Sequence, residues 1–273
     1  SRSIYLDYNA TTPLDPEVQE AMAEAFAIYG NPSSTHHLGR HAKELIEASR
    51  YTLCQFLGCQ PDQLIFTSGA TEANNLIINN IVQNNPKGHI CTSTIEHSSI
   101  HVPLEYYQAK GYNVTFADVD HNGYICPKTI ENAITPETKL IAVMMVNNEV
   151  GTIQPIQDIG DIAQQHSILC LTDAVQALGK IPLNLSAMPI DFATFSSHKI
   201  YGPKGIGALY IKDPNTFHPL LLGGGQEQGF RSGTESTVSI VGFSKAIEIL
   251  ETKMDADNQH SHAMQHDFIQ ALN

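Results

Sequence analysis

Short apolar runs without polar alternation recur along the chain, and they predict strands that are buried on both faces. The runs are Leu64–Thr67, His89–Thr92, Asn113–Ala117, Leu140–Val146, Ile168–Leu171, Phe192–Phe195 and Gly207–Ile211. Apolar residues at helical spacing lie between several of them, over Glu72–Val82, Ser98–Ala109, Lys128–Ala133 and Ile156–Gln165. This repeated strand–helix–strand order predicts an α/β fold, in which helices cover both faces of a mostly parallel, seven-stranded sheet.

Further helices are predicted at both ends of this pattern. Asp15 and Pro16 are preferred residues at a helix start, and apolar residues follow at near-helical spacing over 17–29. A second helix is predicted from about His41 to Phe56, and Gly58 is suited to end it. Residues 238–272 predict one nearly continuous helix.

Composition limits the classes of function. The 273 residues are 42% hydrophobic, enough for a sizeable core in one large α/β unit or two smaller units. The 28 acidic and 15 basic side chains give a net charge of −13, which argues against nucleic acid as the main partner. A local basic pocket for a small anion remains compatible with this charge.

The cysteines and the apolar runs predict a location. The five cysteines are an odd number without a C-x-x-C pair, so neither a disulfide framework nor a structural zinc site is expected. This pattern predicts a reducing compartment, and we expect the cytoplasm. No apolar run is long enough to cross a membrane, and the first residues lead directly into strand-like sequence, so we expect no signal peptide.

Candidate chemistry lies just after the predicted strands, because ligands of open parallel sheets gather at the carboxyl ends of the strands. Small residues from Ser68 to Thr71 lead into a helix there, and the exposed N–H groups of a helix start attract anions. An ordinary helix cap at Ser68 or Thr71 explains the same residues equally well. The segment is therefore a candidate anion site.

Asp173 follows the predicted strand that ends at Leu171. A carboxylate at the end of a buried strand is costly unless it meets a cation or several hydrogen-bond donors. One suitable partner is the protonated pyridine nitrogen of a cofactor derived from vitamin B6. The alternative is that Asp173 caps a following helix.

Lys199 follows the strand that ends at Phe195, just before a turn rich in glycine and proline. A lysine held near a ligand forms Schiff bases with aldehydes, provided that its pKa is lowered. Ser196 and His198 flank it with groups suited to phosphate. We therefore favour a functional lysine over a solvated surface lysine.

Other candidates follow further strands. His97 is suited to lie across a planar ring or to move protons, or else it is an ordinary loop histidine. Asn148 offers amide donors or belongs only to a turn. The glycine-rich stretch from Gly223 to Thr234 is a weak candidate phosphate site. We expect no metal site, because the order Glu96-His97 is not the H-E-x-x-H arrangement of zinc proteases, and the histidines at 260, 262 and 266 fit a solvated helix.

Taken together, these segments resemble the NifS/IscS-type cysteine desulfurases of the class-V aminotransferase family. The matching segments are Tyr5–Pro13, Gly30–Ser34, Ser68–Glu72, Thr172–Gln176, Ser196–Gly207 and Gly223–Thr234. They are collinear over the whole chain, and His198–Gly205 and Arg231–Thr234 favour the NifS/IscS branch over the SufS-like branch. The resemblance implies the type I fold of transferases that depend on pyridoxal 5′-phosphate (PLP), and a homodimer.

The resemblance also implies a role for each matching residue. Lys199 would hold PLP as a Schiff base, and Asp173 would pair with the ring nitrogen. His97 would stack on the ring and move protons, as a second catalytic residue beside Lys199. The remaining contacts implied are Gln176 with the phenolic oxygen, Asn148 with ring or substrate, Ala70, Thr71, Ser196 and His198 with the phosphate, and Thr234 with the phosphate of a neighbouring subunit.

The implied reaction converts L-cysteine to L-alanine and passes the sulfur on as a persulfide, for iron–sulfur clusters or thio-cofactors. The implied protein partner is an iron–sulfur scaffold or another sulfur acceptor. Alternatives are a related class-V enzyme, such as a selenocysteine or cystine lyase, and a non-catalytic PLP-binding fragment or paralogue. None of the five cysteines matches the persulfide motif, and the arginine that binds the substrate carboxylate also has no counterpart, so both are expected beyond residue 273.

The resemblance divides the chain into three parts. Residues 1–15 would be an N-terminal arm of the small domain, residues 16–250 the large PLP-binding domain, and residues 251–273 the start of the C-terminal small domain. The resemblance implies that most of that small domain lies outside this sequence. We expect a fragment of a longer polypeptide, because a helix without its partner sheet would expose apolar surface; the alternative is a shortened paralogue.

Overall fold

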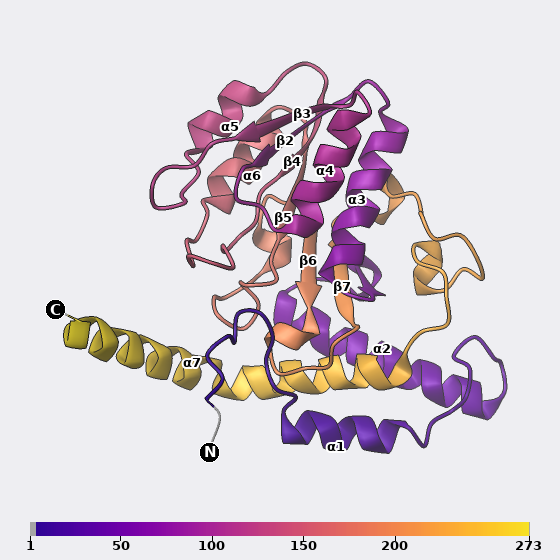
Figure 1. Ribbon diagram of the computed structural model, residues 1–273. Helices are drawn as coiled ribbons and strands as arrows, with labels where there is room; N and C mark the ends of the chain where they lie inside the picture. The colour runs from indigo at the N-terminus through magenta and orange to yellow at the C-terminus, as the bar shows by residue number, and fades with distance from the viewer. Residues whose placement is uncertain (1–3, 273) are drawn as a thin grey trace.

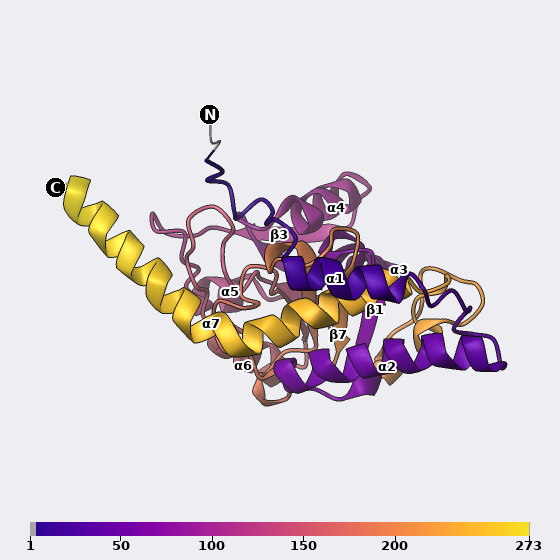
Figure 2. The same ribbon diagram turned by 90° about the horizontal axis from the view of Figure 1, so that it is seen from below.

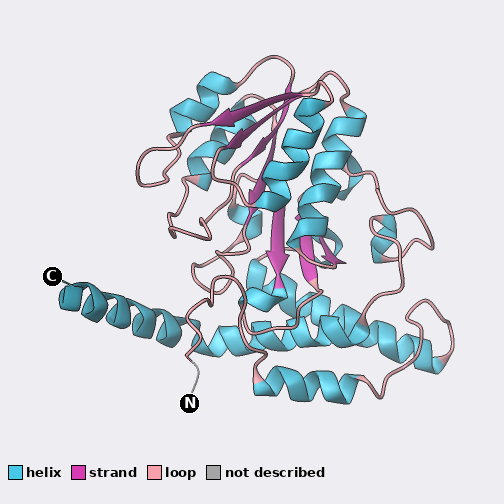
Figure 3. Cartoon of the chain, viewed as in Figure 1, coloured by secondary structure: helices cyan, strands magenta, loops and turns pink. Residues whose placement is uncertain are grey.

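The computed structural model describes residues 4–272, and its strands form one seven-stranded sheet (Figures 1 and 3). The strands are β1 (Leu64–Thr67), β2 (His89–Ser93), β3 (Asn113–Ala117), β4 (Thr138–Ala142), β5 (Leu169–Asp173), β6 (Phe192–Ser196) and β7 (Gly207–Ile211). Their order across the sheet is β1-β7-β6-β5-β4-β2-β3. Only β7 runs antiparallel to its neighbours, so the predicted mostly parallel sheet is confirmed. The connection from β6 to β7 is too short for a parallel crossover.

Helices cover both faces of the sheet, as predicted. They are α1 (Pro16–Ala25), α2 (His37–Leu57), α3 (Ala70–Asn84), α4 (Ser98–Ala109), α5 (Pro127–Ala133), α6 (Ile156–Gln165) and α7 (Thr237–Leu272). Side chains of α3 and α4 form one buried cluster, whereas those of α1, α2, α5, α6 and α7 belong to the other. Ile65 of β1 joins the first cluster and its neighbours Leu64 and Phe66 join the second. Burial on both faces therefore explains the unbroken apolar runs.

Several boundaries differ from the predictions. The first helix ends at Ala25 rather than near residue 29, and α2 begins at His37, four residues earlier than predicted. The caps are as predicted, because Asp15 accepts a hydrogen bond from Glu17 and Gly58 adopts a left-handed conformation (φ +68°). The strand predicted over Leu140–Val146 ends at Ala142. Beyond Ala142, β4 would have no neighbouring strand on the side of β2, because β2 ends at Ser93 and the chain then leads into α4.

The first part of α7 packs against α1 and α2, whereas the part after Asn258 extends beyond the rest of the chain (Figures 1 and 2). Met264, Phe268 and Leu272 are exposed there. Among residues 4–272, no helix combines the length and the apolar character needed to cross a bilayer. The predicted domain boundaries after residues 15 and 250 stay a prediction. Residues 1–3 of the first predicted part and residue 273 of the last lie outside the described residues.

A buried ion pair fastens the loop before α7 to α2. Arg50 binds both carboxylate oxygens of Glu227 at 2.8 Å, and the backbone N–H of Phe66 donates to the same carboxylate at 2.6 Å. Burial alone lowers the pKa of Arg50, but the hydrogen bonds and charge of Glu227 raise it above its ordinary value, so the guanidinium stays charged. Removing one partner would leave a buried, unpaired charge.

We expect Arg50→Met to lower the free energy of unfolding by about 3 kcal/mol, because Glu227 then lacks its cation. Urea unfolding followed by circular dichroism measures this loss. Lys43→Met is a suitable control, since Lys43 is exposed on the same helix and its loss changes stability by at most about 0.5 kcal/mol. Equal stability of the two variants would contradict this role of the ion pair.

Candidate active site

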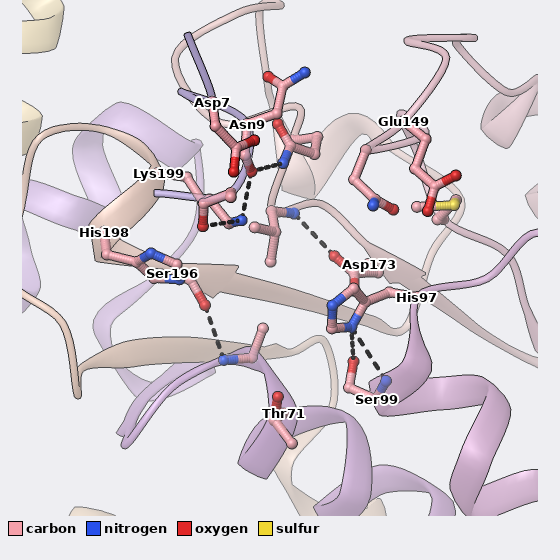
Figure 4. Close-up of a pocket in the computed structure, with 16 residues that line it drawn as sticks. Asp7, Asn9, Thr71, His97, Ser99, Glu149, Asp173, Ser196, His198 and Lys199 are labelled. Carbon is pink, nitrogen blue, oxygen red and sulfur yellow. Dashed lines mark hydrogen bonds between the residues drawn. The ribbon is translucent and has the colours of Figure 1, made fainter. Parts of the chain in front are cut away.

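A cavity of about 610 Å³ opens at the carboxyl ends of the central strands (Figure 4). Segments that follow β1, β2, β4, β5 and β6 all contribute, together with the N-terminal arm around Asn9. The lining residues include Ala70, Thr71, His97, Asn148, Asp173, Gln176, Ser196, His198 and Lys199. Nine of the predicted cofactor-binding residues therefore share one cavity, as expected where parallel strands end together.

Asp173 ends β5 at the floor of this cavity, and its side chain is buried. One carboxylate oxygen accepts the backbone N–H of Val175 at 3.0 Å, and the other accepts Nδ2 of Asn74 at 3.2 Å. Burial raises the pKa of Asp173, whereas these hydrogen bonds and the charges of His97 and Lys199 oppose the rise. The carboxylate therefore favours any cation that enters the cavity.

Lys199 ends a short 3₁₀ turn (Ser197–Lys199) directly after β6. Its Nζ donates to the backbone carbonyls of Asn9 at 2.5 Å and Ala10 at 2.8 Å, so the N-terminal arm holds the amine at the cavity (Figure 4). Burial lowers the pKa of Lys199, whereas the charges of Asp173 and Asp7 oppose this effect. A lowered pKa increases the fraction of neutral, nucleophilic amine.

The first turn of α3 borders the cavity with donors suited to an anion. Ser196 Oγ accepts the N–H of Ala70 at 3.0 Å, which leaves its own hydroxyl proton for another partner (Figure 4). Thr71 follows in the first helical turn, where N–H groups lack intrahelical acceptors. Across from this turn, His198 contacts Thr11 Oγ1 through Nδ1 at 3.1 Å. Burial and the nearby charges of Lys199 and Lys204 lower the pKa of His198.

His97 lies beside Asp173 and caps the start of α4 (Figure 4). Its Nδ1 accepts the backbone N–H of Ser99 at 3.1 Å and lies 2.8 Å from the Ser99 hydroxyl. Because a backbone N–H can only donate, Nδ1 is the acceptor and the neutral ring carries its proton on Nε2. The cap therefore selects one tautomer of the imidazole.

The residue before His97 has an unusual environment. The carboxyl of Glu96 is buried, lies 2.5 Å from Ser93 Oγ, and accepts the N–H of Met144 at 2.9 and 3.0 Å. Met144 lies two residues beyond the end of β4, in the segment that the sequence predicted as strand. Its N–H is bonded by the Glu96 side chain and not by the carbonyl of a neighbouring strand. Burial raises the pKa of Glu96 to about 8, the charge of Asp173 adds to the rise, and the two hydrogen bonds oppose it.

One predicted residue lies apart from the others. Thr234 does not line the cavity at the strand ends; it lines another cavity together with Arg231 and Ser68. Arg231 pairs there with Glu72 of α3 at 2.8 Å. The role that the resemblance implies for Thr234, at the phosphate of another subunit, stays a prediction.

Sequence reasoning missed several residues that shape the cavity. The carbonyls of Asn9 and Ala10 leave no signal in the side-chain pattern. Asn74 gave a weak signal, because it is a polar residue one helical turn after Ala70, on an apolar face. The sequence drew attention to Glu96 only as the neighbour of His97. Its burial could not be predicted, because it depends on where β2 ends and the chain leaves β4.

None of the five cysteines lines the cavity. Cys91 and Cys170 are buried in β2 and β5, and burial raises the pKa of each to about 12. Cys54 and Cys59 are buried, whereas Cys126 is exposed at the start of α5. No thiol among residues 4–272 is therefore positioned to react with a ligand in the cavity.

The comparison with protein families covers almost the whole chain. Residues 4–273 match the family described as "Aminotransferase class-V". The chain belongs to the class-V aminotransferase family. PLP is the cofactor of this family, so the predicted cofactor is supported at the family level.

Curated relatives of this class-V chain have a common name. "Cysteine desulfurase IscS" of Dictyoglomus turgidum is 44% identical over 259 residues, and that of Rickettsia typhi is 46% identical over 263 residues. Each match covers 94% of this chain but only 66% and 64% of the relative, so the chain spans slightly less than two thirds of their length.

Solved structures confirm the predicted type I fold of PLP-dependent transferases. A protein named "NifS-like protein" superimposes with a TM-score of 0.96 at 37% identity, over 99% of this chain and 76% of that one. A structure described as "SspA in complex with cysteine" has a TM-score of 0.88 at 41% identity, over 90% of this chain and 72% of that one.

The position of Glu96 leads to a testable pH dependence. Its pKa is higher in the folded chain than in the unfolded chain, so the stability that the neutral carboxyl contributes is lost as pH rises towards 8. Glu96→Gln retains a neutral group of the same shape. We therefore expect the variant and the wild type to be equally stable at pH 4, and the variant to be more stable by about 4 kcal/mol at pH 8.5.

Urea unfolding at the two pH values provides the measurement. Glu105→Gln is a matched control, because Glu105 is exposed on α4, the helix that follows Glu96. A pH dependence of Glu96→Gln that parallels both the wild type and this control would show that Glu96 is already ionised at pH 7.

Proposed function

We propose that this chain is the greater part of a PLP-dependent cysteine desulfurase, which converts L-cysteine to L-alanine and transfers the sulfur to a thiol. The observation that carries the proposal is the joint placement of Lys199, Asp173 and the first turn of α3 around one cavity. Lys199 suits an aldehyde carbon, Asp173 suits a protonated ring nitrogen, and the first turn of α3 suits a phosphate. The names of the relatives support cysteine as the substrate.

The chemistry of the lining residues fits PLP. The buried carboxylate of Asp173 has no hydrogen bond to a cationic side chain among residues 4–272, which suits a protonated ring nitrogen. Ser196 retains a hydroxyl proton beside the start of α3, which suits a phosphate dianion. Lys199 has an amine of lowered pKa, which suits an aldehyde.

The residues of the chain perform the remaining tasks in this proposal. When bound, PLP supplies an electron-accepting ring that stabilises negative charge on the substrate carbon. Lys199 would hold the cofactor and would move a proton through Nζ. His97 would lie over the ring and exchange a proton at Nε2, because its Nδ1 is occupied by the cap of α4. Gln176 would supply an amide group to the phenolic oxygen of the cofactor, and Asn148 would supply one to the ring or the substrate.

The sulfur-accepting thiol is proposed to be none of the five cysteines described above, because each lies outside the cavity. The proposal also includes a homodimer, in which Thr234 reaches the phosphate of the neighbouring subunit, and a sulfur-acceptor protein, such as an iron–sulfur scaffold, as a partner. The free thiols support a reducing compartment, and we propose the cytoplasm.

Lys199→Ala tests the proposal most simply. We expect the full-length protein with PLP to absorb near about 400 nm, and the variant to lose this band together with alanine production, because no other lysine lines the cavity. Absorbance spectra and quantification of alanine from L-cysteine provide the two readouts. Lys139→Ala, at the opposite end of β4, should retain both.

A wild-type protein that gains no absorbance band with PLP would contradict the cofactor. A band without alanine from L-cysteine would contradict the reaction. Release of alanine from selenocysteine or cystine alone would assign the chain to another activity of the class-V family.

A further inference from the structure

A second lysine is connected to the cavity without lining it. Lys180 follows β5, and its Nζ donates to Oε1 of Gln176 at 2.5 Å. Because an ammonium group can only donate, it requires the oxygen of the amide and not its nitrogen. The Nε2 of Gln176 therefore points the other way, where it donates to the carbonyl of Asn9 at 3.1 Å. In the reversed amide, Nε2 would face the Nζ of Lys180, which is also a donor, and Oε1 would face the carbonyl of Asn9, which is also an acceptor.

The same carbonyl of Asn9 accepts the Nζ of Lys199 at 2.5 Å (Figure 4). Lys180, Gln176, Asn9 and Lys199 thus form one continuous chain of hydrogen bonds. Gln176 is buried, so its amide has few alternative partners in water. The orientation of the Gln176 amide consequently depends on Lys180.

Helix α7 determines the place of Lys180. Gly179 has a φ of +74°, and a Cβ atom there would lie 2.9 Å from both δ carbons of Leu250 on α7. One residue later, the carbonyl of Lys180 accepts Nδ2 of Asn258, also on α7, at 3.1 Å. The turn that carries Lys180 is therefore held against α7 at two successive residues.

The charge of Lys180 acts on the site as well. As a whole residue Lys180 is exposed, but the contact of its Nζ with Gln176 is partly buried. Burial and the nearby charge of Lys199 lower the pKa of Lys180 to about 8, so the group is mainly charged at pH 7. Coulomb repulsion acts on both partners, and a charged Lys180 therefore disfavours protonation at Lys199.

Other charged groups lie near these two lysines. Asp7 of the arm and Asp173 of β5 both favour the protonated form of Lys199. On α7, Asp257 precedes the Asn258 that holds Lys180, and its charge acts on Tyr201. At Lys199, the positive charge of Lys180 thus opposes the effect of Asp7 and Asp173.

We propose that Lys180 is a positioning residue of the active site, which orients the Gln176 amide and places a second positive charge beside the lysine that binds the cofactor. This inference rests on the proposed function, because it concerns the same cavity. It assigns a task to a residue that neither lines the cavity nor touches its contents.

The test compares Lys180→Met with Lys180→Arg in the full-length protein loaded with PLP. The readout is the pH titration of the visible absorption band of the lysine-linked cofactor. We expect Lys180→Met to raise the apparent pKa by about 0.5 or more, a roughly threefold gain in proton affinity, because one positive charge is lost. Lys180→Arg retains the charge and the donors, and its titration should match the wild type within about 0.2.

Lys139→Met is the matched control, because it removes the same charge at the opposite end of the sheet. Its titration should match the wild type. If Lys180→Met also matches the wild type, the proposed role of Lys180 is wrong. Should Lys180→Met fail to fold, Lys180→Gln is equally neutral and suits an exposed position, so the same shift is expected from it.

A second readout separates this inference from the proposed function. In the protein without cofactor, the pH dependence of Lys199 acetylation by acetic anhydride, followed by mass spectrometry, should shift upwards in Lys180→Met. An unchanged profile would overturn the role of Lys180. A wild-type protein without a PLP band would contradict the proposed function, and the acetylation profile would still decide the role of Lys180.

Discussion

The carboxyl group of Asp173 lies inside the protein, and no cationic side chain among residues 4–272 donates a hydrogen bond to it. Such a group is costly to bury, and the chain compensates for only part of this cost. Asn74 reaches it from α3 and Val175 from the turn after β5. Because α3 also presents its first turn to the cavity, the same packing that supports Asp173 places an anion site at a fixed distance from it. A ligand with a cation at one end and an anion at the other satisfies both groups.

The N-terminal arm and α7 bring distant parts of the sequence to this cavity. Asn9 and Ala10 hold the amine of Lys199, nearly 190 residues away in sequence. On the other side, α7 holds the turn of Lys180 through Leu250 and Asn258. The reactivity of Lys199 therefore depends on backbone carbonyls and on a second cation, in addition to Asp173.

The sequence predicted the fold well where one local signal dominated. Unbroken apolar runs located the seven strands, and the rule that ligands gather at strand ends led to Asp173, Lys199 and His97. The strand after Leu140 was predicted too long, because its end depends on β2 turning away, a non-local event. Glu96, Asn9 and Lys180 could not be predicted for a related reason. Their roles arise from contacts between segments that are far apart or from backbone atoms, and neither leaves a periodic pattern.

The central claim is that Asp173 remains ionised inside the protein in order to hold a protonated ring nitrogen. Nitrogen-15 NMR of the full-length protein, loaded with PLP labelled at the ring nitrogen, measures this protonation directly. The account predicts the chemical shift of a protonated ring nitrogen throughout pH 6–9, and its loss in Asp173→Ala. The shift of an unprotonated ring nitrogen in the wild-type protein at neutral pH would contradict the account.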